Sequence, residues 1–467
     1  MAIIFQRKPL TNYLTSTLVP IIFQVFENTA DTTNIVARCY YINQTTAVET
    51  ALGGKFRLAN VPNINYVYQF DASEIFNNLT KYTLFDMPNN QQLGNSSGAP
   101  NLYKVWQDVA TFKVVVKFQR EYLDGTTGLI VLDPTEVSSN IFYVHEGVPD
   151  RRWLTQRVRS NGQGGSIFNF FQFLYESAVR RKRWFTNYPI KFSGGTDYQS
   201  FVNIHETEQY MLMFYGNQQG AGEIRFRTYA SFDGSGAILG TNTIATNASE
   251  KNVSTTCVGF RDIVNGFTAN AGTEGANFAN VRSYKVDYLV NAGGGISPYM
   301  ATEYVFNVDR QCLKNKGYLR FCFKNSMGGY DMVSSTGKYK EGTKNKFQNF
   351  EQTLGYENWK TPMAFGNSNW ANESITEYSV STQFMKPEYA KHFSEMFSST
   401  QVYLKVANDG FTQVSDADIA LSNYEQPYYF VPIVITPATA VFEDTTENVQ
   451  QLKFKFARAV NQRQPRY

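Results

Sequence analysis

The segment from 318 to 339, YLRFCFKNSMGGYDMVSSTGKY, combines residue types that often do chemistry: two cysteines, a Gly-Gly pair and a Gly-Lys pair. A phosphate-binding loop of the P-loop type requires the spacing G-x-x-x-x-G-K-[ST], which places backbone N–H groups and the lysine around the phosphates. Met332 stands where the first glycine should be, five positions before Gly337, and Tyr339 replaces the final hydroxyl residue. The spacing therefore excludes this type of phosphate loop.

The histidines and cysteines show no metal-site spacing. The run HETEQ (205 to 209) is similar to the zinc-protease motif H-E-x-x-H, but Gln209 occupies the second ligand position and the chain has only 3 histidines. A chain of this length needs no disulfide staples. We expect free, buried thiols, no metal site and no cofactor, with weak calcium binding by Asp- and Asn-rich turns as the alternative. The cysteines are Cys39, Cys257, Cys312 and Cys322.

No catalytic constellation stands out in the sequence. We see no nucleophile elbow, since the G-x-S-x-G match GNSSG (94–98) lies in a run rich in Asn, Ser and Gly. No spacing suggests a Ser/His/Asp triad, and no pair of carboxylates stands out from the scattered acidic residues. We therefore expect a protein that is not an enzyme.

Charge and hydropathy limit the partners. Lys+Arg number 43 and Asp+Glu 40, a formal charge of +3, so no global field would hold the chain on nucleic acid or an anionic membrane. No apolar run reaches 18 residues, so membrane insertion is not expected. The N-terminus, MAIIFQRKPL, places apolar residues before basic ones, the reverse of a secretory signal. We expect the chain to fold in a cytoplasm.

Alternating apolar and polar residues predict many strands. The segments 111–133, 222–240 and 402–414 each alternate into an Asp-Gly pair, which tolerates the positive φ of tight hairpin turns. Aromatic residues make up 15% of the chain, in keeping with strand preference. The predicted fold is mainly β, with two or more β-sandwich-like domains and a few short helices.

Three segments have helical patterns. DASEIFNNLTKY (71–82) begins like a capping box, with Glu74 three residues after Asp71. KPEYAKHFSEMFSST (386–400) has Pro387 at the first helical position and an apolar stripe that we interpret as core. FNFFQFLYESAVRRKRWF (168–185) suits a helix or a strand.

The opening segment itself is predicted to be a hairpin. YLRFCFKN alternates so that Leu319, Phe321 and Phe323 share one face, and Gly328-Gly329 then turn the chain before a second strand. The predicted structural turn consists of Gly328, Gly329 and Asp331.

Basic residues concentrate in one region. Between 151 and 191 there are nine cations and the single anion Glu176, interleaved with aromatic residues. A nucleic-acid strip is one interpretation. We favour a subunit contact instead, because the chain as a whole is nearly neutral, and we group the C-terminal arm with it. The residues of this predicted contact are Arg180, Arg181, Lys182, Arg183, Arg463 and Arg466.

These patterns suggest four parts. They are an N-terminal β domain (1–150), a basic and partly helical connector (151–195), a central β domain (196–385), and a C-terminal helix-strand unit with a terminal arm (386–467).

Several blocks resemble, in the same order, β-rich structural proteins of tailed bacteriophages that infect Bacteroidetes. The main one is FCFKNSMGGYDMVSSTGKY, preceded by YVFNVDRQCL, which is similar to a strand-turn-strand signature with an aromatic residue, N-x-x-G-G-x-D, and then T/S-G. The other blocks are PIIFQVFENT, YQFDASEIFNNL, PEYAKHFSEMFSSTQVYLKV and FVPIVITPATAVFEDTTENVQQLKFKFARAVNQ.

This resemblance implies a structural subunit of a virion. Such a protein would form rings in a tail, neck or baseplate, with copies of itself and other virion proteins as partners. A receptor-binding or polysaccharide-binding tail module, or a depolymerising one, is the first alternative, and a head-decoration protein is the second. A structural subunit should bury its aromatic residues, whereas a binding module should expose an aromatic groove.

Overall fold

The computed structural model describes residues 3–9, 14–29, 31–43, 46–61, 64, 66–81, 106–108, 111–147, 184, 186, 188, 191–194, 197–206, 210–215, 222–246, 253–260, 263, 278–291, 296–298, 302–310, 319–351, 367–406, 429–444, 449–458 and 462–463.

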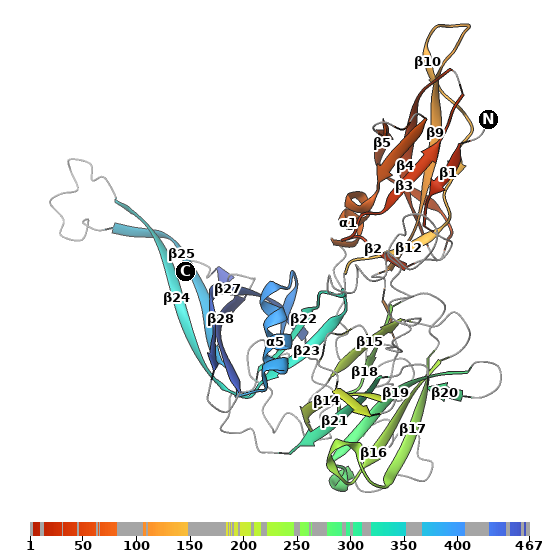
Figure 1. Ribbon diagram of the computed structural model, residues 1–467. Helices are drawn as coiled ribbons and strands as arrows, with labels where there is room; N and C mark the ends of the chain where they lie inside the picture. The colour runs from red at the N-terminus through yellow and green to blue at the C-terminus, as the bar shows by residue number, and fades with distance from the viewer. Residues whose placement is uncertain are drawn as a thin grey trace, which may run out of the picture. The chain divides into compact units, whose positions relative to one another are not determined.

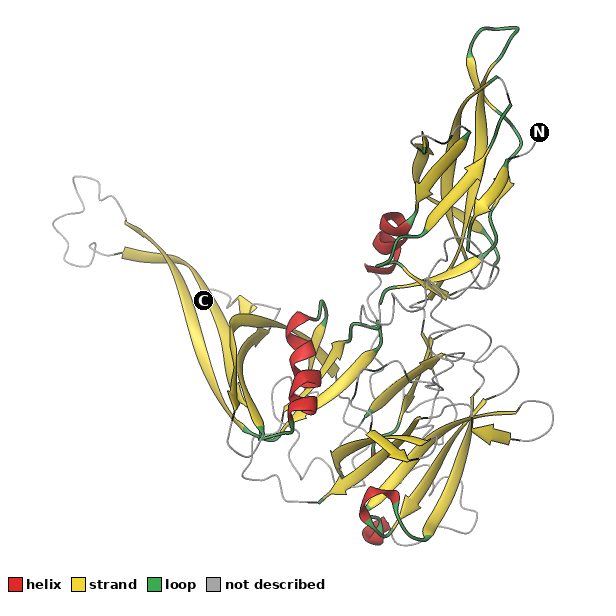
Figure 2. Ribbon diagram, in the orientation of Figure 1, coloured by secondary structure: helices red, strands yellow, loops and turns green. Residues whose placement is uncertain are grey.

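Strands dominate this described part of the chain (Figures 1 and 2), which confirms the predicted mainly β fold with several sheets and few short helices. Contacts divide the chain into two compact units. The first comprises Met1–Asp86, Leu93–Arg310 and Asn325–Tyr330, and the second comprises Met87–Gln92, Gln311–Lys324 and Asp331–Tyr467. The finer four-part division at 150, 195 and 385 stays a prediction. None of the described helices is long and apolar enough to cross a membrane.

The first unit begins with an N-terminal sandwich of two sheets, ordered β1-β3-β7-β6 and β2-β12-β9-β4-β5, with β10 and β11 also pairing with β9. Its strands are β1 (Ile4–Arg7), β2 (Leu14–Ser16), β3 (Ile22–Phe26), β4 (Thr32–Ile42), β5 (Glu49–Arg57), β6 (Ala59–Asn60), β7 (Val67–Asp71), β9 (Thr111–Leu123), β10 (Ile130–Leu132), β11 (Val137–Ser138) and β12 (Phe142–His145).

Aromatic rings join the two sheets of this sandwich. Phe23 of β3 lies 5.7 Å from Phe118 of β9 and 6.0 Å from Phe142 of β12, between ring centroids. Helix α1 (Ser73–Lys81) closes one end through Phe76, which packs against Phe142 at 5.8 Å. The predicted cap is present in part, since the Asp71 carboxylate accepts the backbone N–H of Ser73 at 2.9 Å.

The loop after β9 differs from the predicted two-residue turn. It runs from Asp124 to Leu129, which are joined by a backbone hydrogen bond of 2.9 Å, and the positive φ (66°) belongs to Gly128. The Asp124 carboxylate accepts hydrogen bonds from Thr126 N at 3.0 Å and Thr127 Oγ1 at 2.6 Å. These bonds lower the pKa of Asp124 and stabilise a wider loop than the Asp-Gly pair alone predicts.

The rest of the first unit contains two further sheets, ordered β13-β14-β21-β19-β16-β17, with β20 beside β19, and β15-β18-β8. Their elements are β8 (Trp106–Asp108), β13 (Lys191–Gly194), β14 (Asp197–His205), β15 (Met211–Tyr215), β16 (Gly222–Tyr229), η2 (Phe232–Gly234), β17 (Ile238–Thr246), β18 (Val253–Cys257), η3 (Phe278–Asn280), β19 (Ser283–Asn291), β20 (Ile296–Pro298) and β21 (Thr302–Asp309).

Tyrosine and phenylalanine rings form the core of these sheets. Tyr284 stacks on Phe306 at 4.8 Å, and the buried Trp184 contacts Tyr304 at 5.9 Å. The second predicted Asp-Gly turn lies in η2, where Asp233 (φ 59°) and the glycine after it (φ 62°) both adopt positive φ.

The second unit is built around one sheet, ordered β23-β22-β26-β27-β28-β25-β24, with β29 beside β25. Phe393 and Met396, from α5 and the turn after it, pack on this sheet against Phe321, Phe454 and neighbouring apolar residues. The elements are β22 (Leu319–Lys324), β23 (Tyr330–Ser335), β24 (Lys338–Glu351), β25 (Asn367–Ser381), α5 (Pro387–Glu395), η6 (Met396–Ser398), β26 (Val402–Val406), β27 (Tyr429–Asp444), β28 (Gln450–Arg458) and β29 (Gln462–Arg463).

Two of the four cysteines have described side chains, and both are free thiols in the interior. Cys39 lies in β4 and Cys322 in β22. Burial raises the pKa of Cys39 to about 12, and it raises that of Cys322 as well. Both groups are therefore neutral thiols, poor nucleophiles, at physiological pH.

We predict that Cys39 and Cys322 escape alkylation by iodoacetamide at pH 8 in the native protein and react completely after unfolding, as measured by peptide mass spectrometry. The control is Val48→Cys, at a position that is 58% exposed, which should react without unfolding. Rapid native alkylation of either interior thiol would show that its site opens to solvent.

Candidate functional site

The predicted glycine turn joins β22 to β23 and is organised by Asn325. The backbone N–H of Asn325 donates to Gly329 O at 2.7 Å, and its side-chain Oδ1 accepts from Gly329 N at 3.0 Å. Gly328 N also donates to Asn325 O, at 2.9 Å, and Gly328 has a φ of 85°. The sequence analysis identified the glycines of this turn but missed the role of the asparagine, although an Asn ahead of a Gly-Gly pair is a usable signal for an Asx-type turn.

This turn packs tightly on the end of β12, within the first unit. His145 Nε2 lies 2.9 Å from Met327 O, and both residues are almost fully buried. A β-carbon on Gly328 would overlap Glu146 O and the His145 ring, and one on Gly147 would overlap Met327 O. Two backbones thus meet where neither can carry a side chain, which makes the turn a structural contact rather than a ligand loop.

Asp331, predicted as part of the turn, lies in β23 and takes part in a different arrangement. It is 3% exposed and faces His392 of α5, with Asp331 Oδ2 3.7 Å from His392 Nε2. Glu395 Oε2 lies 3.8 Å from the other ring nitrogen, Nδ1. Among the described residues, these three side chains form a group whose donor atoms lie close enough together to hold a metal ion.

His392 and Glu395 were not among the residues predicted to form a site, because the apolar stripe of this helix indicates only a core position. Their i, i+3 spacing places both on one helix face and was a detectable signal. Their proximity to Asp331, about sixty positions earlier in the chain, depends on how the helix packs and could not be read from spacing.

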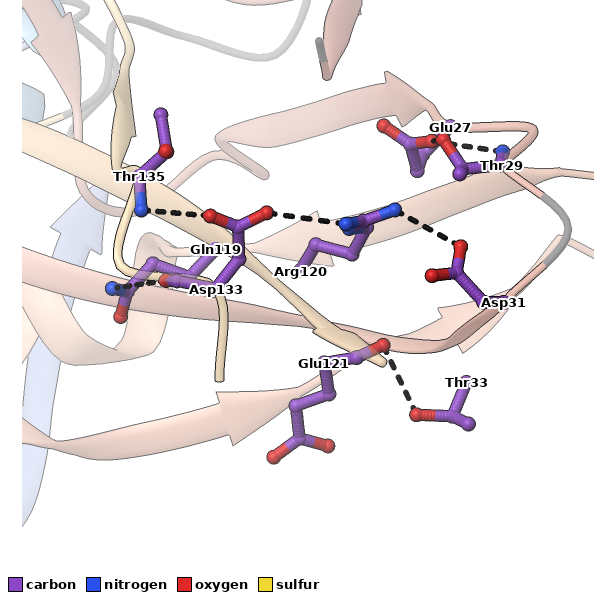
Figure 3. A network of polar contacts seen from close by, with 9 residues as sticks. All are labelled: Glu27, Thr29, Asp31, Thr33, Gln119, Arg120, Glu121, Asp133 and Thr135. Carbon is purple, nitrogen blue, oxygen red and sulfur yellow. Dashed lines mark hydrogen bonds and ion pairs between the residues drawn. The ribbon is translucent and has the colours of Figure 1, made fainter. Parts of the chain in front are cut away.

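A polar network lies on the N-terminal sandwich, near the base of the β9–β10 hairpin (Figure 3). Arg120 of β9 pairs with Asp31 at 3.2 Å and with Asp133 at 3.3 Å. Asp133 also accepts the backbone N–H of Thr135 at 2.9 Å, and this bond is the main reason that its pKa is lowered. The paired charges join three segments, so the network supports the base of the hairpin.

The tip of this hairpin exposes a small apolar cluster. Leu123 and Ile130 are direct cross-strand neighbours and are 49% and 58% exposed, and the adjacent Leu129 is 64% exposed. All three side chains lie next to the Asp124 loop, at the end of the hairpin. Exposed branched side chains at a hairpin tip are candidates for contact with another molecule.

The predicted basic contact falls mostly outside the described residues. Arg180, Arg181, Lys182, Arg183 and Arg466 lie there, and so does all but Trp184 of the segment 168–185, which was expected to form a helix or a strand. Arg463 belongs to β29, which pairs with β25 through Glu373. His205, from the HETEQ run, is buried at the end of β14.

A long two-stranded ribbon extends from the sheet of the second unit. β24 and β25 are antiparallel partners along their whole length. Lys338 lies opposite Ser381 at one end, and Glu351 lies opposite Asn367 at the other. β28 supports β25 only over Glu377–Ser381, and β29 adds Glu373 and Ser374. Among the described strands, residues 367–372 of β25 pair with β24 alone, and β24 ends the sheet with an open edge. Figure 1 shows the pair continuing past β27 and β28.

Comparison with known proteins adds no relative: no protein-family model matches the chain, and no curated protein is significantly similar to it.

We predict that Gly328→Ala lowers the free energy of unfolding by about 2–4 kcal/mol, because the substitution combines a positive φ with overlap against backbone atoms. Denaturant unfolding provides the measurement. Gly125→Ala is the control, since an added β-carbon there meets nothing within 4 Å, and it should change stability by no more than about 0.5–1 kcal/mol. Equal stability of the two variants would contradict the close contact at the turn.

Proposed function

We propose that the chain is a non-enzymatic structural subunit of a tailed-phage virion, a ring-forming component of the tail, neck or baseplate. It would assemble with copies of itself and with neighbouring virion proteins. The resemblance of several sequence blocks to structural proteins of tailed phages suggests that the chain belongs to a phage particle. The β24–β25 ribbon is the observation that supports assembly.

The ribbon supports assembly because two strands alone are poorly stable in water. Residues 343–351 of β24 extend for about 30 Å at strand spacing, and their partners in β25 are mostly without a second neighbour among the described strands. The outer edge of β24 pairs with no other strand in the described part of the chain, and a strand from another chain could complete its backbone hydrogen bonds. A subunit that donates such an edge would gain order on assembly.

The sequence of β24 also limits its partners. The strand reads KYKEGTKNKFQNFE, with lysines at 338, 340, 344 and 346. Lysines on an edge strand discourage indiscriminate pairing between sheets. A partner strand with acidic residues would be preferred, so that charge selects the correct neighbour.

The distribution of aromatic residues favours a structural subunit over the receptor- or polysaccharide-binding alternative. The largest fully buried side chains are all aromatic, among them Trp184, Tyr284 and Phe118. Of the described side chains, the large aromatic ones that are exposed are Tyr66, Phe232 and Phe384, which come from three separate segments rather than one groove. The second alternative is that the chain is a head-decoration protein, located on the head of the particle instead of the tail, neck or baseplate.

We predict that shortening the ribbon abolishes assembly and preserves the fold. The variant lacks residues 345–351 of β24 and 367–374 of β25, which form the distal part of the ribbon. Lys344 and Ile375, which are cross-strand partners, then become the last pair of the ribbon. Because the excised part has little other support, the melting temperature should change by only a few degrees, while rings or tubes of uniform diameter seen by electron microscopy of the purified protein should disappear.

The control variant carries Lys344→Arg and Lys346→Arg, which retain strand length and charge, and it should assemble like the unmodified protein. Unchanged particles from the shortened chain would refute a role for the ribbon. A monomeric full-length protein that binds host polysaccharide would instead support the binding-module alternative.

A further inference from the structure

The donor atoms of Asp331, His392 and Glu395 converge beneath α5. One oxygen or nitrogen of each lies within 4.8 Å of the others. The separations of 3.7 and 3.8 Å between the imidazole nitrogens and the carboxylates are longer than hydrogen bonds. The two separations involve different ring nitrogens, Nε2 toward Asp331 and Nδ1 toward Glu395, and an ion takes only one of them. With one donor atom per residue the donors lie within 4.8 Å of one another, and ligands at 2.1 Å from a tetrahedral ion lie about 3.4 Å apart, so the side chains would have to move closer to hold one.

The three side chains are held by the surrounding structure. Phe323 of β22 lies 5.8 Å from the His392 ring, and Phe393 packs on the core beside it. Ser399 Oγ, just after the helix, donates to Lys324 O at 2.7 Å and fixes the helix end to β22. Ligands on a strand and a helix that are already packed together lose little freedom when an ion binds.

Charge also favours a cation at this position. Asp331 is buried, and its carboxylate faces α5, 3.7 Å from His392. An imidazole in its neutral form has a lone pair that can coordinate a metal ion. Two carboxylates and a neutral imidazole carry a net negative charge, which a divalent ion would offset.

The donor set selects the class of ion. One imidazole nitrogen and two carboxylate oxygens suit a first-row transition ion such as Zn²⁺, while Ca²⁺ and Mg²⁺ prefer oxygen ligands throughout. The Glu395 side chain is 17% exposed, which leaves a path to solvent and room for water as a further ligand.

We propose that Asp331, His392 and Glu395 form a binding site for a divalent transition-metal ion that fastens α5 to β23. The site is independent of the proposed role in a virion. Its effect is structural: the ion links a helix to the strand that follows the Gly328 turn.

The test compares two substitutions on one helix. Glu395→Gln removes a proposed ligand, and Glu388→Gln makes the same change at an exposed position in the first turn of α5. Each full-length protein is stripped with chelator, titrated with Zn²⁺ alone by calorimetry, and checked for bound zinc by elemental analysis after dialysis.

We expect one zinc per chain and a higher melting temperature with zinc for the unmodified protein and Glu388→Gln. Glu395→Gln should bind at least about tenfold more weakly, with no rise in melting temperature. Circular dichroism identifies any variant that fails to fold, and His392→Gln then serves as a second test. No zinc uptake by the unmodified protein, or equal affinity in Glu395→Gln and Glu388→Gln, would overturn the proposal.

Discussion

Backbone hydrogen bonding along strand edges is the constraint on which this structure depends. Each strand has donors and acceptors on both sides, and those that lack a neighbour must be paired, covered or left in water. Inside the sheets, neighbouring strands on both sides satisfy the backbone hydrogen bonds. Strand β9, for example, pairs with β4 on one side and with β10, β11 and β12 on the other. Among the described strands, β24 has a neighbour on one side only, which is β25. The proposed assembly would complete the other edge with a strand from another chain.

The cores explain why such an edge can project without destabilising the rest. Aromatic rings from facing layers pack together in both units, as Phe23 does with Phe118 between two sheets and as Phe393 of α5 does with Phe321 of the sheet. These contacts bury large apolar areas close to each sheet and stabilise it locally. The distal part of the ribbon lies beyond such support. A packed sheet with a weakly supported ribbon fits the proposed subunit, whose ribbon would become fully ordered on assembly.

Much of the fold was predictable from local pattern. Period-two alternation located β9, β16 and β22, and the caps at Asp71 and Pro387 located both described helices, because these signals depend on neighbouring residues. The loop at Asp124 was predicted incorrectly, since side-chain hydrogen bonds to Thr126 and Thr127 favour a wider turn than the Asp-Gly pair implies.

The functional features were harder to predict because they depend on contacts between distant segments. The need for glycine at 328 arises from the end of β12, almost two hundred positions earlier. The convergence of Asp331 with His392 and Glu395 requires α5 to lie over β22 and β23 (Figure 1). The open edge of β24 is a property of strand order, which alternation does not encode. The basic residues 180–183, conspicuous in the sequence, lie outside the described structure.

Hydrogen–deuterium exchange of the β24 backbone tests assembly through this edge most directly. Amides of residues 338–351 should exchange rapidly in dilute, monomeric protein wherever they point away from β25, and slowly once rings or tubes have formed. Amides of the interior strand β9 should show the same protection in both states, which provides the internal reference. Equal exchange along β24 in monomer and assembly would contradict the account, because the edge would then have gained no partner.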